Sequence, residues 1–246
     1  MKTPSAPLGT TIAVIGAGRL GGVLTRALRG AGFAVTGPLH REEEVPASDI
    51  VILCVPDAEI AAAAAVARPR AGLLGHVSGA TGLDDADFSI HPLQTFTGGE
   101  APDVFHGIGA AIAGCTEDAE RTAAQLAEAL GAHPFPVDDA HRAGYHAAAS
   151  LASNLLLVVL DAAEQAAVAA GIRSDEIREL LAPLVDRTVE NWATQGASRA
   201  LTGPIARGDE QTVRRQRDAI SQQTPALLPL FDQLADGARA LARAHH

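Results

Sequence analysis

The sequence predicts an α/β protein in which a doubly wound parallel sheet is followed by an all-helical C-terminal domain. Three observations support this fold class. The glycine pattern Gly16–Gly21 directly follows a short apolar run near the start of the chain. Apolar runs then alternate with helical patterns up to about residue 138. Beyond that point only helical patterns remain.

The first strand and helix are predicted close to the start of the chain. Residues 11–18 form an apolar run that breaks into glycines, as a buried parallel strand does where it ends at a βα turn. Apolar residues then recur at helical spacing from Leu20 to Ala31, and Gly30 and Gly32 end this helix. Further strands are predicted over 33–37, 49–56, 73–80, 88–92, 107–114 and 134–138, with helices over 58–67 and 116–130.

Strand signals stop near residue 138, which predicts one domain over 1–138 and a second over 139–246. The second domain is predicted to hold helices over 139–170, 174–194, 210–221 and 225–243, with a glycine- and proline-rich loop over 200–209.

Residues 143–160 carry no Asp, Glu, Lys or Arg and approach the length of a membrane span. The run nevertheless holds polar residues, among them His146, Ser150 and Asn154, and much alanine. These residues favour a helix buried in a bundle or a dimer over a membrane span.

The formal net charge of −10 argues against a nucleic acid or an anionic membrane as partner, because both need a basic protein face. A small anionic ligand is still compatible, since a few arginines can hold it. Cys54 and Cys115 lie in apolar surroundings without a partner motif, which predicts free buried thiols in a reducing, cytoplasmic compartment. Residues 1–10 lack the apolar run of a secretory signal, so none is predicted.

The segment Gly16-Ala17-Gly18-Arg19-Leu20-Gly21 has the pattern G-x-G-x-x-G between a strand and a helix. In this context the first glycine permits a tight turn, the second lets the backbone approach a pyrophosphate, and the third lets helix and strand pack closely. The helix N-terminus adds free N–H groups and a partial positive charge. The pattern predicts a Rossmann domain that binds NAD(P); the alternative is a glycine-rich turn without a ligand.

The choice between NAD and NADP depends on the end of the second strand, where an acidic residue would hold the ribose 2′-hydroxyl of NAD. Residues 36–37 are Thr and Gly at this place, and His40 and Arg41 follow. A missing carboxylate and a nearby guanidinium favour NADP(H), with NAD still possible, and Arg19 could assist. The alternative is that Arg41 only pairs with Glu42–Glu44 at the surface.

Residues after the next predicted strands should line the nicotinamide pocket, because ligands of open α/β sheets bind at the carboxyl ends of strands. Val55, Pro56 and Asp57 end the third strand, and Ser78 lies at the end of the fourth. His91 follows in the fifth and could donate a proton or bind a substrate, although a histidine at a strand end can also be purely structural.

Three polar residues of the uncharged run, His146, Ser150 and Asn154, are spaced i, i+4 and i+8 and should share one helix face. Buried polar groups are costly unless they are paired or contact a ligand, so this face is a candidate catalytic site. The alternative is a hydrogen-bonded seam between helices.

Thr202 and Arg207 lie in the loop between the helices of the second domain. Arg207 could bind a substrate carboxylate through two hydrogen bonds. Alternatively, Arg207 and Asp209 only cap the next helix. No set of metal ligands is predicted.

Six motifs in this order resemble a Rossmann-like family with a C-terminal domain of unknown function 2520: IGAGRLG, VPD, HVSGA, SIHPLQTF, YHAAASLASN and ALTGPIARGD. The resemblance places the chain in the 6-phosphogluconate-dehydrogenase-like superfamily, beside ketopantoate reductase, pyrroline-5-carboxylate reductase and deazaflavin-dependent NADP reductases. It implies a helical domain that forms a homodimer and a substrate held between domains. It also implies a Lys-x-x-x-Asn pair, of which Asn154 matches the asparagine, whereas Ser150 stands in place of the catalytic lysine.

Together these observations predict an NADPH-dependent reductase of a small anionic 2-keto or imino acid, with ketopantoate as the specific candidate. His146 would donate the proton, Asn154 would bind the substrate carbonyl, and Thr202 and Arg207 would bind its carboxylate. Because the lysine is missing, a second hypothesis is a regulatory protein that senses NADP(H) without turnover. A third is a helical protein whose Rossmann domain no longer binds a nucleotide.

Overall fold

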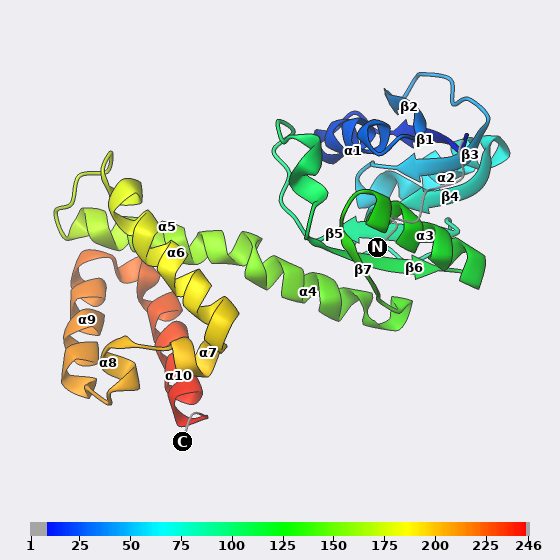
Figure 1. Ribbon diagram of the computed structural model, residues 1–246. Helices are drawn as coiled ribbons and strands as arrows, with labels where there is room; N and C mark the ends of the chain where they lie inside the picture. The colour runs from blue at the N-terminus through cyan, green and yellow to red at the C-terminus, as the bar shows by residue number, and fades with distance from the viewer. Residues whose placement is uncertain (1–8, 245–246) are drawn as a thin grey trace. The chain divides into compact units, whose positions relative to one another are not determined.

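The computed structural model describes residues 9–244, whose helices and strands are labelled in Figure 1. Contacts divide the chain into two units, Met1–Ser153 and Asn154–His246. The first contains the sheet and is called the sheet unit here; the second is called the helical unit. The prediction about a secretory signal falls on the first residues of the chain, outside the described ones.

In the described residues, seven strands form one sheet in the order β2-β1-β3-β4-β5-β6-β7. They are β1 (Thr11–Ile15), β2 (Ala34–Leu39), β3 (Ser48–Leu53), β4 (Ala71–His76), β5 (Phe88–Pro92), β6 (Gly109–Gly114) and β7 (His133–Pro136). Neighbouring strands are parallel except β5 and β6, so the sheet is mostly parallel, in keeping with the predicted fold class, and contains one antiparallel pair. Between these two strands the chain forms only the 3-10 turn η3 (Pro102–Phe105), and an antiparallel pair needs no crossover helix.

Helices cover both faces of the sheet, as the sequence predicts. Helices α1 (Arg19–Gly30) and α3 (Glu117–Ala129) pack on one face, in the same apolar cluster as Val14 of β1. Helix α2 (Ile60–Ala67) follows the 3-10 turn η1 (Asp57–Glu59) and packs on the other face, in the same cluster as Ile15. Val14 and Ile15 face opposite ways because successive side chains of a strand alternate.

Strand β1 lies between β2 and β3, so the chain reverses its direction across the sheet after the first βαβ unit. Open α/β sheets bind ligands in the crevice at such a reversal, outside the carboxyl ends of the strands. In this protein the reversal lies between the turn that follows β1 and the loop that follows β3. The strand order therefore points to this edge as the place to look for a site.

The single helix predicted over 139–170 is wrong in one respect, because it is interrupted. The 3-10 turn η4 (Asp139–His141) and helix α4 (Arg142–Ala152) belong to the sheet unit, and α5 (Asn154–Ala169) begins the helical unit. At Ser153 the backbone has φ −127° and ψ −85°, and its Oγ donates a 2.8 Å hydrogen bond to a carbonyl one turn earlier. Serines that bond back to their own helix often bend it, and apolar periodicity does not report this.

The helical unit contains α5, α6 (Ile177–Gln195), α7 (Ala197–Ala200), α8 (Gly203–Ala206), α9 (Glu210–Gln223), the 3-10 turn η5 (Pro225–Leu227) and α10 (Leu228–Arg243). The three long helices after α5 match the predicted ranges within a few residues, and Pro183 lies inside α6. Among the described residues of this unit, the buried apolar side chains are Ile177, Val213 and Ala235. This core is small for a unit of its length.

Many large apolar side chains of α4 and of the helical unit are exposed. They are Leu151, Leu155, Leu157, Val158, Val168, Ile172, Leu180, Leu184, Val189, Trp192, Leu234 and Leu241. By length and composition, the stretch Asp139–Ala169 could also cross a membrane, and no residue of its apolar window is buried. Contiguous exposed apolar surface is typical of interaction sites in proteins.

Candidate functional site

Backbone contacts at the turn after β1 require glycine at two positions. Gly16 has a φ of +108°, and a Cβ at this residue would overlap the carbonyl oxygen of Cys54. A Cβ on Gly21 would overlap the carbonyl oxygen of Gly16, so α1 packs directly on the turn. Gly18 differs: it is the N-cap of α1, and a Cβ there would meet nothing within 4 Å. Gly18 therefore keeps open space in front of the helix N-terminus.

A cavity of about 680 Å³ opens at this turn, between the segment after β2 and the start of α2. Its volume lies within the range of small-molecule sites. The predicted cofactor residues that line it are Gly16, Ala17, Gly18, His40, Arg41, Val55 and Pro56. The residues that sequence reasoning missed are Glu43, Glu59 and a set of apolar side chains: Ile15, Leu39, Val45, Cys54, Ala58, Ala62, Ala63 and Val66.

Five residues predicted to bind the cofactor do not line this cavity: Arg19, Leu20, Gly21, Asp57 and Ser78. Leu20 packs against the core on the α1 face, and Gly21 is buried beneath the turn. Arg19 and Asp57 are exposed at the first residues of α1 and η1.

Arg41 forms an ion pair with Glu59, with 2.5 Å between Nη2 and Oε2. The alternative predicted from the sequence, a pairing of Arg41 with Glu42–Glu44, is therefore not observed. Glu59 is eighteen positions further along the chain and belongs to η1, after the next strand. Only the fold brings this carboxylate to the end of β2, so sequence spacing could not reveal it.

The loop after β4 is held by its own side chains. Ser78 Oγ accepts hydrogen bonds from the backbone N–H groups of Ala80 at 3.1 Å and Thr81 at 2.9 Å. The Ser78 N–H donates to Nδ1 of the buried His76 at 3.2 Å, and Nε2 of His76 donates to the Gly82 carbonyl at 3.0 Å. Burial lowers the pKa of His76, in keeping with this neutral tautomer. The Ser78 hydroxyl thus shapes the loop.

The strand register brings His91 to the same edge of the sheet as Ser78. Leu53 pairs with His76 across β3 and β4, and His76 pairs with Ser89 across β4 and β5. Ser78 and His91 each follow two positions later, so both lie at the carboxyl ends of neighbouring parallel strands. The loop after β3 begins at this edge too.

His91 lies in a cluster of rings with two residues of α4. Its Nδ1 is 2.6 Å from the hydroxyl of Tyr145, and its ring meets the rings of Tyr145 and His146 edge-on, with centroids 5.6 and 5.9 Å away. Tyr145 also packs edge-on against Phe135 of β7. A Cβ on Gly79 would lie 2.9 Å from both histidine rings, so the loop backbone fits closely against them. Tyr145 was not predicted as a site residue.

Burial sets the protonation states in this cluster. Desolvation, the largest cause, and the neighbouring His146 together lower the pKa of His91 to about 4, against an opposite contribution from Asp57. Desolvation also raises the pKa of Tyr145 to about 12. His91 is therefore neutral at pH 7 and can accept or donate a hydrogen bond, but it does not act as an imidazolium acid there.

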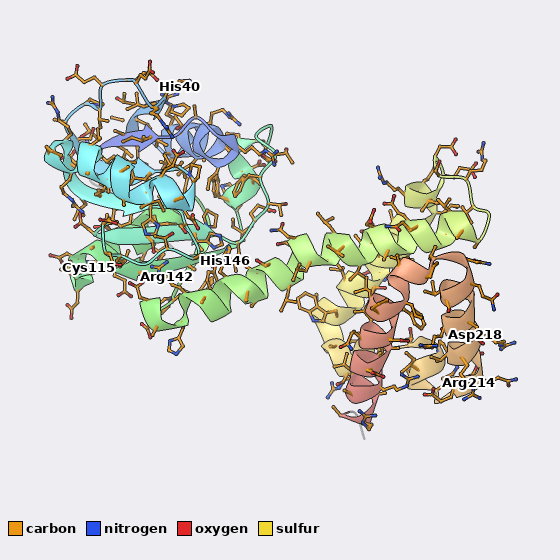
Figure 2. All side chains as sticks on the ribbon, turned by 180° about the vertical axis from the view of Figure 1, so that it is seen from behind. His40, Cys115, Arg142, His146, Arg214 and Asp218 are labelled. Carbon is orange, nitrogen blue, oxygen red and sulfur yellow. The ribbon has the colours of Figure 1, made fainter. Side chains whose placement is uncertain are left out.

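A buried arginine attaches the start of α4 to the sheet. Arg142 is 4% exposed, and it is labelled together with His146 on α4 in Figure 2. Its Nη2 donates to Ser89 Oγ at 2.6 Å and its Nε to Asp139 Oδ1 at 2.5 Å, while Asp139 Oδ2 accepts the N–H of Leu83 at 3.0 Å. These bonds hold β5, the loop after β4 and α4 together. The sequence signal for Arg142 is its position as the last charge before the uncharged run.

The predicted face of His146, Ser150 and Asn154 is divided between two helices. His146 and Ser150 lie one turn apart on α4, whereas Asn154 is the first residue of α5, beyond the interruption at Ser153. The spacing argument holds for the first two residues only, because it assumed one continuous helix.

Thr202 and Arg207 flank the short helix α8 in the helical unit, and both are exposed. Thr202 is the N-cap of α8 but makes no side-chain capping bond. Asp209 caps α9, since its Oδ1 accepts the Thr212 N–H at 3.1 Å, as the alternative hypothesis predicted for this residue. Arg207 makes no such cap and is still available as a ligand for an anion.

Both cysteines are free thiols, Cys54 half-buried and Cys115 exposed, which corrects the prediction that Cys115 is buried. Desolvation raises the pKa of Cys54 to about 12, so its thiol stays protonated. Within residues 9–244, no three side chains of His, Cys, Asp or Glu come together in a group that could hold a metal ion.

Comparison with known proteins gives one family and several solved structures. Residues 108–237 match the family model described as a domain of unknown function (DUF2520). Protein TM1727 of Thermotoga maritima is 22% identical, with a TM-score of 0.81 over 94% of this chain and 99% of its own. A Bacteroides fragilis protein, provisionally assigned as an NADP oxidoreductase, is 21% identical, with a TM-score of 0.77 over 94% and 98%.

Pyrroline carboxylate reductase of Plasmodium falciparum, solved with NADP bound, is 10% identical and has a TM-score of 0.60 over 95% of this chain and 100% of its own. A search of curated proteins finds no relative that matches this chain. At these identities the solved structures establish a shared fold, and they confirm the Rossmann-like architecture predicted from the sequence.

The low pKa of His91 predicts how stability depends on pH. Its folded-state pKa of about 4 lies below the ordinary value of 6.5, so the unfolded chain binds the proton first as the pH falls. The free energy of unfolding should therefore decrease between pH 6.5 and pH 4, by at most about 3 kcal/mol from this residue. In His91→Gln the decrease, measured by urea unfolding, should be smaller. Parallel curves for the two proteins would contradict the assignment.

Proposed function

The chain belongs to the family of the domain of unknown function 2520, and we propose that it is an NAD(P)H-dependent oxidoreductase of small 2-keto or imino acids. The observation that carries the proposal is the glycine turn after β1, which opens into a cavity of about 680 Å³ at the reversal point of the sheet. Proteins of the same fold whose names include NADP or a reductase activity support it.

The residues around the cavity fit a dinucleotide. Gly18 leaves open space at the N-terminus of α1, where unpaired N–H groups and the helix dipole favour a pyrophosphate. The first turn of α1 contains no acidic residue that would repel it. Apolar side chains such as Val45 and Val66 supply surface for the adenine ring.

His40 and Arg41 support NADP(H) as the preferred cofactor. Both follow β2 directly and line the cavity, at the strand end where Rossmann proteins bind the adenosine ribose. Arg41 would bind the 2′-phosphate, for which a guanidinium is well suited.

A bound reduced nicotinamide would supply the hydride of the reaction. His146 would donate the proton that the substrate oxygen or nitrogen needs, and the neutral His91 would orient the Tyr145 hydroxyl next to it. Ser150, which stands in place of the lysine of related enzymes, cannot serve as an acid of comparable strength. This absence is the reason to assign the proton transfer to His146.

The substrate would be a small acid, with ketopantoate as the first compound to test. Asn154, Thr202 and Arg207 of the helical unit are proposed as its ligands, the amide for the carbonyl and the guanidinium for the carboxylate. The cytoplasm is the proposed compartment, in keeping with the two free thiols.

A homodimer formed through the helical unit is part of the proposal. Leu157, Leu180 and Leu184 are 63%, 60% and 64% exposed, while the unit buries few apolar side chains of its own. A second copy would cover these leucines and complete the core, which favours a dimer over insertion of the apolar stretch into a membrane.

Alanine substitutions at two glycines of the turn should separate NADPH binding from stability. Gly18→Ala should fold normally, because its Cβ has room, but should weaken NADPH binding about tenfold or more by occupying the space for the pyrophosphate. Gly21→Ala should instead destabilise the fold, because its Cβ overlaps the turn. NADPH fluorescence titration and thermal unfolding separate these effects. Unchanged NADPH affinity in Gly18→Ala would place the pyrophosphate elsewhere.

Replacement of His146 should affect turnover alone. His146→Ala should slow NADPH oxidation by about 100-fold or more, as loss of a general acid does, while NADPH still binds. His141→Ala is the matched control, because this exposed histidine lies just before α4 and pairs with Asp138 at the surface. Equal turnover of the two variants would remove His146 from the mechanism. Saturable binding with no oxidation by any keto or imino acid would support an NADP(H) sensor.

The dimer should depend on the exposed apolar face. The protein should have twice the mass of one chain in light scattering, and Leu184→Asp should dissociate it by adding a charge that is costly to bury. Leu184→Met keeps the apolar surface and should remain dimeric. A monomeric protein, or one found only in membranes, would argue against this interface.

A further inference from the structure

Opposite charges face each other across the mouth of the cavity. Arg41 lies two positions after the end of β2, and Glu59 lies in the turn that leads into α2. Both line the cavity, and their ion pair joins the two sides with 2.5 Å between nitrogen and oxygen. Arg41 is the residue that the proposed function assigns to the 2′-phosphate of NADP(H).

This ion pair is easily broken. The side chain of Arg41 is 77% exposed and that of Glu59 is 43% exposed, so water can replace each partner at little cost. Arg41 can therefore leave Glu59 for a stronger anion. The Glu59 carboxylate, however, stays at the cavity mouth after the exchange.

A second carboxylate lines the same mouth. Glu43 accepts a hydrogen bond from the backbone N–H of His40, with Oε2 2.5 Å from the nitrogen. This bond shapes the segment after β2, so Glu43 has a structural role. Glu59 is different, because within residues 9–244 its carboxylate forms its ion pair with Arg41 itself.

We propose that Glu59 is a specificity-determining residue that limits the preference of the cavity for NADP(H) over NAD(H). This inference rests on the proposed function, because it requires that the cavity bind the dinucleotide. A 2′-phosphate carries nearly two negative charges at neutral pH and must take Arg41 away from Glu59. It then lies near an unpaired carboxylate, and like charges repel. NAD(H) has no phosphate at this position and leaves the ion pair intact.

The test measures NADPH and NADH dissociation constants by fluorescence titration of the full-length protein. Glu59→Gln should bind NADPH about threefold to tenfold more tightly, because it removes both the competition for Arg41 and the repulsion. Its NADH affinity should change by less than about twofold. The gain for NADPH should shrink at high salt, since both effects act between exposed charges.

Glu44→Gln is the matched control. It removes one negative charge from the segment after β2 that also contains Arg41. Glu44 itself does not line the cavity, and it pairs with Arg70. Its NADPH to NADH ratio should equal that of the wild type. An equal gain in Glu44→Gln would overturn the inference, because it would show a general effect of net charge.

Arg41→Gln completes the cycle. It should weaken NADPH binding selectively, and adding Glu59→Gln should then recover less than the single substitution gains in the wild type. If both nucleotides bind but Glu59→Gln leaves their ratio unchanged, the inference is wrong and the proposed function stands. If neither nucleotide binds to the wild-type protein, both are wrong.

Discussion

The close packing of α1 on the turn after β1 is the constraint on which the candidate site depends. The contact is between backbone atoms: Gly21 lies against the carbonyl of Gly16, and Gly16 lies against that of Cys54. Any side chain at either glycine would push the helix away from the sheet. The same contact places the N-terminus of α1 at the reversal of strand order, where the neighbouring loops leave a cavity. Tight packing and the open space in front of the helix N-terminus therefore arise from one short segment.

A second set of polar contacts places the cluster of His91, Tyr145 and His146 at the carboxyl end of β5. The Arg142 guanidinium, although buried, is compensated by Asp139 and by the hydroxyl of Ser89, and so it can hold α4 against β5 without an unpaired charge. With α4 in this position, Tyr145 and His146 meet His91. The geometry of the proposed proton-transfer site thus depends on a residue that need not touch a substrate.

The two units differ in how complete they are. The sheet unit buries apolar side chains on both faces of its sheet, whereas the helical unit leaves leucines exposed on α5 and α6. A sheet covered by helices on both faces buries its apolar side chains within one unit, whereas a few helices around a small core leave part of theirs exposed. This difference is the reason why the proposed dimer forms through the helical unit. In such a dimer, the apolar stretch that has the length of a membrane span would lie in a protein interface.

Local patterns in the sequence were sufficient for the strands, the long helices and the glycine turn, because each depends on periodicity or on backbone freedom within a few residues. They also singled out His40 and Arg41, which line the cavity, and His91, which lies in the ring cluster. They could not show that β5 and β6 run antiparallel or that Glu59 meets Arg41, since these depend on contacts between distant segments. They also missed the interruption at Ser153, because a serine that bonds back to its own helix leaves the apolar periodicity unchanged. The sequence by itself determined which residues could carry the chemistry. Tertiary structure alone decided which charges and rings share a site, because folding brings side chains together across strands whose separation along the chain has no fixed relation to distance.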